Sequence, residues 1–180
     1  MEIVQDRERL VAALRTRGVD YLAPSDAAGA PVEEATLIAS LASHDDARLK
    51  QALSALFLVR PDLAPRVPGL VEALPHDAAV SLTARYQAAV YLRAMWATRL
   101  GRYLPALPPL PDYFSEPLAL PEPRVLHGKA GLYALAAWHE NVTGRRANYR
   151  AEYENAAALL FGRLRVRAHW HDAAVARQPG

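Results

Sequence analysis

Apolar residues recur every three to four positions along most of this chain, which is the period of an α-helix with one buried face. The first such stretch predicts a helix over about 2–17, in which the apolar residues are Ile3, Leu10, Val11 and Leu14. Gly18 is a natural C-terminal stop for this helix. Residues 19–31 are rich in Asp, Ala, Gly and Pro and are expected to form a loop.

Two further helices are predicted before residue 60. An acidic pair that follows Pro31 opens the first of them, because negative charge near a helix N-terminus suits the helix dipole. Asp45 or Asp46 is expected to cap the second, which runs over about 47–59. The two helices together predict a helical hairpin.

A long central helix is predicted next. Residues 61–69 contain three prolines and can support only short turns, and a short helix over about 69–74 follows. Asp77 is the expected N-cap of a helix over about 78–102. Apolar residues cover most of its girth, so this helix should be central and largely buried. Its polar side is a partial arc that carries four arginines, Arg85, Arg93, Arg99 and Arg102.

Residues 105–123 contain seven prolines and predict an extended crossing with partial polyproline character. Apolar side chains between the prolines indicate that the crossing is pinned to the rest of the protein. Leu110, Tyr113 and Phe114 are the candidates for a surface that a partner protein contacts. The closely spaced prolines also resemble the core of an SH3 ligand, and a packed structural crossing is the alternative.

The chain is predicted to end in two more helices. One covers about 129–142 and is closed by Gly144, and the other covers about 147–170. The core face of the last helix is lined by Tyr149, Tyr153, Ala157, Leu160 and Leu164. Residues 173–180 are expected to be frayed.

Composition supports the same fold class. Alanine, the best helix former, makes up about a fifth of the residues, whereas β-branched residues are scarce. We therefore predict an all-α protein, an irregular bundle of about six to seven helices in a single domain over 1–180. The absence of cysteine excludes disulfides and cysteine zinc sites. The chain shows neither a membrane-spanning apolar run nor a signal-peptide pattern, so a cytoplasmic location is expected.

The net charge of +2 conceals an asymmetry along the chain. Residues 1–123 carry 12 Lys/Arg against 15 Asp/Glu, whereas residues 124–180 carry 9 against 4. This divides the domain into an acidic helical half over 1–104, the crossing over 105–123 and a basic helical pair over 124–172. A function is expected where the two unlike halves meet, or on the basic end.

The basic end carries a cluster of six candidate contact residues, Arg163, Arg165, Arg167, His169, Trp170 and His171. Arg163, Arg167 and His171 follow one another at intervals of four and share a helix face. Arginine grips phosphate and an aromatic ring can stack on a base, so the cluster indicates a nucleic-acid or phosphate contact. The alternative is that these cations only stabilise the C-terminal end of a helix dipole.

Catalytic and metal sites are not apparent in the sequence. His169 and His171 point to opposite sides of a helix and cannot share a metal ion there. Glu152 and Glu154 diverge for the same reason. The chain lacks both a glycine-rich phosphate loop and a nucleophile elbow. We therefore expect no cofactor, no metal and no catalytic residue.

The spacing of Arg163 to His169, repeated from Arg165 to His171, resembles the motif of HEPN-type ribonucleases. That resemblance implies that the arginine steadies a phosphate while the histidine transfers a proton. Leu164 follows the first arginine, where the family usually has a polar residue. A HEPN-like ribonuclease, or an inactive relative of one, is therefore an alternative function.

Two other resemblances bear on function. Residues 35–58 resemble one HEAT-type repeat, with a plain helical hairpin as the alternative. Segments 86–92, 110–114, 131–135 and 148–153 resemble uncharacterised bacterial helical proteins that accompany minimal nucleotidyltransferases. This second resemblance implies a partner protein, as in a toxin–antitoxin-like pair. We predict a non-catalytic helical module that binds another protein, and the alternative is a nucleic-acid-binding protein that uses its basic C-terminal helix.

Overall fold

Every regular element in the described part of the chain is a helix, which confirms the predicted all-α class. The fold is a computed structural model that describes residues 3–4, 6–22, 31–104, 108–124 and 128–175, with side chains as far as Trp170. Its elements are α1 (Arg7–Thr16), α2 (Glu34–Ser43), α3 (Ala47–Val59), the 3₁₀-helix η1 (Pro61–Arg66), α4 (Val67–Ala73), α5 (His76–Leu100), α6 (Gly128–Thr143) and α7 (Tyr149–Val175).

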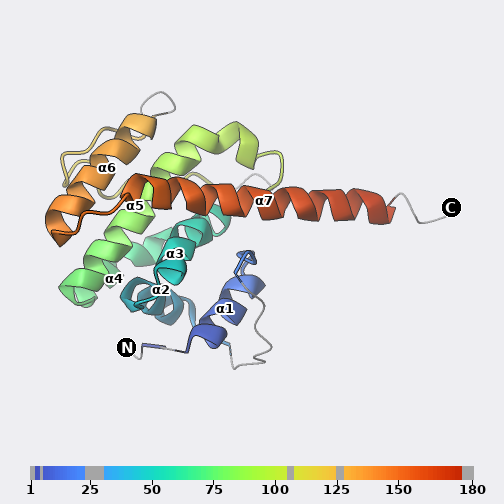
Figure 1. Ribbon diagram of the computed structural model, residues 1–180, viewed down its shortest axis with the longest axis horizontal. Helices are drawn as coiled ribbons and strands as arrows, with labels where there is room; N and C mark the ends of the chain where they lie inside the picture. The colour runs from blue at the N-terminus through green and yellow to red at the C-terminus, as the bar shows by residue number, and fades with distance from the viewer. Residues whose placement is uncertain (1–2, 5, 23–30, 105–107, 125–127, 176–180) are drawn as a thin grey trace.

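Helix α5 is the centre of the packed bundle. It packs against α2, α3 and α4 on the N-terminal side of the chain and against α6 and α7 on the C-terminal side (Figure 1). Nearly every residue from Ala78 to Leu92 is buried, as the apolar girth of this segment predicts. The last turns of α5 are more exposed, and the helix bends at Trp96, whose backbone leaves the helical region. The two halves of the chain therefore meet across α5.

The helix starts show where local sequence rules hold. Asp46 caps α3 and Glu33 caps α2, each by accepting a hydrogen bond from a backbone N–H in the first turn. Two predicted starts are wrong. The first helix begins at Arg7, because Asp6 caps it and the extended chain before it donates from Val4 N–H to Ser40 Oγ at 2.8 Å.

The start of α5 is the second correction. Asp77 does not cap this helix but lies in its first turn, and Pro75 occupies the capping position. Proline has no side-chain acceptor, so no side chain bonds to the first N–H groups of α5. This open helix end becomes part of a cleft described below.

The proline-rich crossing is held against α5, as predicted. The Tyr86 hydroxyl donates to the carbonyl of Pro111 at 2.7 Å, and the Tyr91 hydroxyl donates to the carbonyl of Pro121 at 2.6 Å. Both tyrosine rings are fully buried. The part of the predicted crossing over 105–107 lies outside the described residues. The remainder is a strap across the central helix.

The two C-terminal helices follow the prediction closely, with one extension. Gly144 ends α6 with a φ of +64°, a conformation that suits glycine. The backbone of α7 stays helical to Val175, so residues 173–175, which were expected to be frayed, are helical. Residues 176–180 of the expected tail lie outside the described residues. No described helix is long and apolar enough to cross a bilayer.

Candidate functional site

The last helix leaves the bundle part-way along its length. The predicted core face of α7 is buried from Tyr149 to Leu164. Beyond that point the helix continues past the other helices, to the right in Figure 1. The basic cluster predicted from the sequence lies on this projecting end.

Two of the clustered arginines are bound to the N-terminal half. Arg163 donates to the backbone carbonyl of Asp20 at 2.9 Å, and Arg167 forms an ion pair with the Asp20 carboxylate at 2.8 Å. These contacts join the end of α7 to the segment after α1. Because both guanidinium groups already have acceptors, they offer less to a phosphate than the sequence pattern suggests.

The rest of the cluster is exposed. Arg165, His169 and Trp170 are all open to solvent, and the Trp170 side chain is 65% exposed. The side chain of His171 lies outside the described residues. Arg163 and His169 are six residues apart, which separates them by about a third of a turn around the helix. The structure therefore does not bring this arginine and histidine together on one face.

The three candidate partner-surface residues on the crossing pack against the bundle to different extents, and Tyr113 and Phe114 remain partly exposed. Leu110 is only 7% exposed. The Tyr113 ring stacks on Tyr86 with centroids 5.5 Å apart, and the Phe114 ring meets the same tyrosine edge-on at 5.9 Å. The rings of Tyr113 and Phe114 contact the buried Tyr86 of α5, and Leu110 belongs to the same hydrophobic core. These three side chains therefore help to hold the strap on the bundle.

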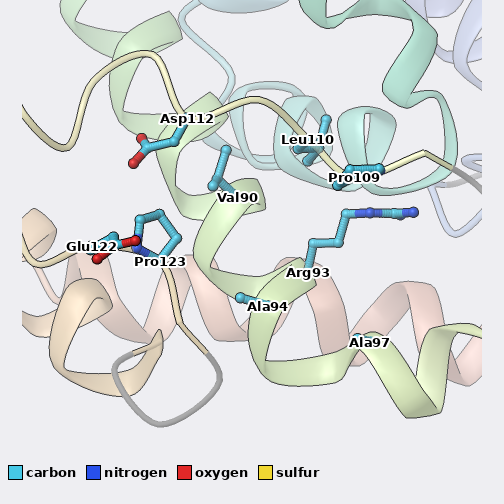
Figure 2. Close-up of a pocket in the computed structure, with 9 residues that line it drawn as sticks. All are labelled: Val90, Arg93, Ala94, Ala97, Pro109, Leu110, Asp112, Glu122 and Pro123. Atoms are coloured by element: carbon cyan, nitrogen blue, oxygen red, sulfur yellow. The ribbon is translucent and has the colours of Figure 1, made fainter.

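A shallow cleft of about 460 Å³ lies between α5 and the strap, and we call it the strap cleft. Figure 2 shows Asp112 and Glu122 on one side of it and Arg93 on the other, with its guanidinium directed away from both carboxylates. Arg93 donates to the carbonyl of Leu58 at 3.3 Å. The charged groups around this cleft therefore do not converge on one point.

A larger cleft of about 920 Å³ opens between the two halves of the chain, and we call it the helix cleft. Its walls come from the α2–α3 turn, the first turns of α3 and α5, the end of α6 and the start of α7. The lining includes four basic side chains, Lys50, Arg85, Arg145 and Arg146, and three carboxylates, Asp45, Asp77 and Glu152. The cleft lies where the sequence predicts that a function should lie.

The floor of the helix cleft contains a buried arginine. Arg85 is 3% exposed, and its Nη2 donates to Glu152 Oε2 at 2.5 Å. Its guanidinium also lies 5.1 Å from the centre of the Tyr153 ring. The other two nitrogens, Nε and Nη1, are buried and donate to no acceptor among the described residues. Unpaired buried donors are rare in folded proteins because each one costs free energy.

His139 lies beside this arginine and is also buried. Its Nδ1 is 2.7 Å from the Tyr153 hydroxyl, and its ring stacks on Tyr149 with centroids 3.9 Å apart. Burial, with a contribution from the positive charge of Arg85, lowers the pKa of His139 to about 3. Burial raises the pKa of Tyr153, so its hydroxyl keeps its proton and can donate to the neutral imidazole.

Sequence reasoning missed this arrangement. It assigned Arg85 to a polar arc, whereas the structure buries Arg85 on the face that also carries Ala78 and Ser81. The sequence did contain a sign of this burial. Arg85 follows Ala78 and Ser81 at helical spacing, and His139 follows the apolar residues Leu132 and Leu135 in the same way. The predicted divergence of Glu152 and Glu154 is confirmed, because they pair with Arg85 and Arg150 respectively.

The burial of His139 predicts a pH-dependent stability. Below its ordinary pKa of 6.5 the unfolded chain takes up a proton at His139, whereas the folded chain does so only near pH 3. Stability is therefore complete well above pH 6.5 and is lost as the pH falls. We expect the free energy of unfolding to drop by about 2 kcal/mol between about pH 8 and pH 5, with most of the loss below pH 6.5.

Urea unfolding at a series of pH values measures this loss. The variant His139→Gln cannot titrate and should lack the slope in that window, while the carboxyl groups protonate mainly at lower pH. Equal pH dependence in the two proteins would show that His139 does not carry it.

Comparison of the chain with protein families, curated proteins and solved structures found no match.

Proposed function

We propose that the protein is a non-catalytic interaction module that places the projecting end of α7 in a groove of a partner protein. The observation that carries this proposal is an exposed apolar stripe. Leu159, Val166 and Trp170 are 39%, 45% and 65% exposed, respectively. At 100° per residue their side chains fall within about 40° around the helix axis.

The composition of the stripe indicates its partner. Tryptophan dominates the energetics of many interfaces, and an amphipathic helix that inserts into a groove uses anchors at this spacing. Exposed Arg165 and His169 flank the apolar residues, so an apolar groove with an acidic rim fits best. The resemblance of the sequence to companions of nucleotidyltransferases makes such an enzyme the first partner to test.

The contacts of Asp20 favour a protein partner over nucleic acid. The Asp20 carboxylate pairs with both Arg163 and Arg167, two of the three arginines in the candidate phosphate contact, and offsets one of their two positive charges. Binding of single-stranded RNA or DNA that weakens steeply with salt would support the nucleic-acid alternative instead. RNA cleavage that is lost in His169→Ala would replace the proposal with a ribonuclease.

The test is capture of a partner by matched variants. Tagged wild-type protein should retain one stoichiometric partner from a lysate of its native cell. Val166→Asp should weaken that capture by about tenfold or more, because it buries a charge in the interface. Val142→Asp is the matched control, since Val142 is similarly exposed at 40% but lies on α6.

Two results would contradict the proposal. One is a wild-type protein that captures nothing in stoichiometric amount. The other is a captured partner whose binding is equally strong with Val166→Asp and with Val142→Asp.

A further inference from the structure

The helix cleft brings together an uncapped helix N-terminus and several basic side chains. The open N-terminus of α5 lies at its mouth, where Pro75, His76 and Ala78 line the wall. The N-terminus of a 25-residue helix attracts negative charge through its N–H groups and its dipole. A helix end alone does not make a site, but this one is joined by charged side chains and by Arg85.

Arginines from the opposite wall face the same cleft. Arg145 and Arg146 lie in the segment between α6 and α7 and are exposed at the mouth. Lys50 of α3 lines the same cleft and is half-buried. Asp45 and Asp77 also reach the mouth and reduce the positive charge there. The ligand must therefore make directional hydrogen bonds, because net charge alone would hold it only weakly.

The floor supplies an independent indication of a ligand. Arg85 lines the cleft two helical turns beyond Ala78, which places it about 10 Å deeper along α5. Its unpaired Nε and Nη1 groups are the kind of buried donors that normally have an acceptor. Ser81 lies between Ala78 and Arg85 on the same face and is 6% exposed. The cleft thus has hydrogen-bond donors at its mouth, from the start of α5, and at its floor, from Arg85.

We propose that the helix cleft binds a small organic phosphate. Its phosphate lies at the mouth between the open N-terminus of α5 and the pair Arg145 and Arg146. Its body reaches inward toward Arg85 and Glu152. A phosphate is favoured over a carboxylate because its three terminal oxygens can accept from helix N–H groups and from guanidinium groups at the same time. The cleft volume is at the upper end of the range for small-molecule sites.

The neutral histidine shapes the inner part of the site. His139 and Tyr149 form a stacked pair that lines the cleft, so an apolar or aromatic body can lie against them. Glu152 already balances the charge of Arg85. The floor is therefore suited to a neutral polar group, such as a hydroxyl or carbonyl, and the mouth to the charged group.

Calorimetric titration with phenyl phosphate, phenol and benzoate tests the proposal. Phenyl phosphate should bind the wild type saturably, with a dissociation constant on the order of 1 mM or tighter for a ligand of this size. Phenol should not bind measurably, and benzoate should bind at least about tenfold more weakly than phenyl phosphate. Absence of saturable phenyl phosphate binding would overturn the site, and equal binding of benzoate would overturn the assignment to phosphate.

Variants locate the binding within the cleft. Arg145→Ala combined with Arg146→Ala should weaken phenyl phosphate binding by about tenfold or more. The control combines Arg102→Ala with Arg124→Ala, which removes the same charge from exposed positions outside the cleft. Arg85→Gln tests the floor and should also weaken binding. If Arg85→Gln does not fold, the exposed pair still decides, and equal weakening by the pair and its control would overturn the proposal.

Discussion

Replacement of Glu152 by alanine is expected to lower the free energy of unfolding by about 2–4 kcal/mol, because it leaves Arg85 as an uncompensated buried charge. The Arg85 side chain is 4% exposed, and Glu152 is its ion-pair partner at 2.5 Å. The expected loss lies slightly below that for a fully buried pair, since the Glu152 side chain is 36% exposed. Urea unfolding at neutral pH measures the change.

The same helix offers a matched control for this prediction. Glu154 pairs with Arg150 at 3.4 Å, with both side chains about a third exposed, so Glu154→Ala should cost less than about 0.5 kcal/mol. Combining Glu152→Ala with Arg85→Met should recover part of the loss, because the unpaired charge is then gone. Equal costs for the two glutamate variants would mean that Arg85 finds other compensation in the folded protein.

Two helical glycines are expected to respond in opposite ways to alanine. A Cβ at Gly131 would lie 2.2 Å from Cε1 of Tyr91, a ring that is fully buried and held by its hydrogen bond to Pro121. We expect Gly131→Ala to destabilise the protein by about 2 kcal/mol, since overpacking outweighs the roughly 1 kcal/mol gain in helix propensity.

Gly162 is the control for this effect. It lies within α7, and an added Cβ would meet no atom within 4 Å. Gly162→Ala should therefore stabilise the protein by about 0.5–1 kcal/mol through helix propensity alone. Thermal and urea unfolding of both variants check the pair, and destabilisation of similar size in both would show that close packing of α6 on α5 is not the cause.

The residues in these predictions connect neighbouring elements of the bundle. Tyr91 connects α6 to the strap, and Arg85 connects α5 to α7 through Glu152. Gln51 adds a link from α3, since its Nε2 donates to the backbone carbonyl of Glu152 at 2.8 Å. The helix cleft is thus bounded by contacts that also hold the two halves of the chain together. A ligand in the cleft would stabilise the fold through the same elements.

Local sequence features determined the helices and most of their boundaries. Periodic apolar positions, the caps at Asp46 and Glu33 and the stop at Gly144 act over a few residues, so they can be recognised without the fold. The burial of α5 also followed from its composition. The predicted start of α5 was wrong because Pro75 and Asp77 are alternatives for the capping position, and local rules do not decide between them.

Tertiary packing alone decided which polar residues came together. Arg85, His139 and Glu152 are far apart in the sequence, and each reads locally as one polar position on an amphipathic helix. Only the packing of α6 and α7 on α5 buries Arg85 and His139 and brings the partly exposed Glu152 onto Arg85, which makes their pairing energetically important. In the same way, the ion pairs of Asp20 with Arg163 and Arg167 reduce the net positive charge of the basic cluster on α7. Such long-range pairings leave little trace in a single sequence, because any of several acidic residues would have satisfied the local pattern.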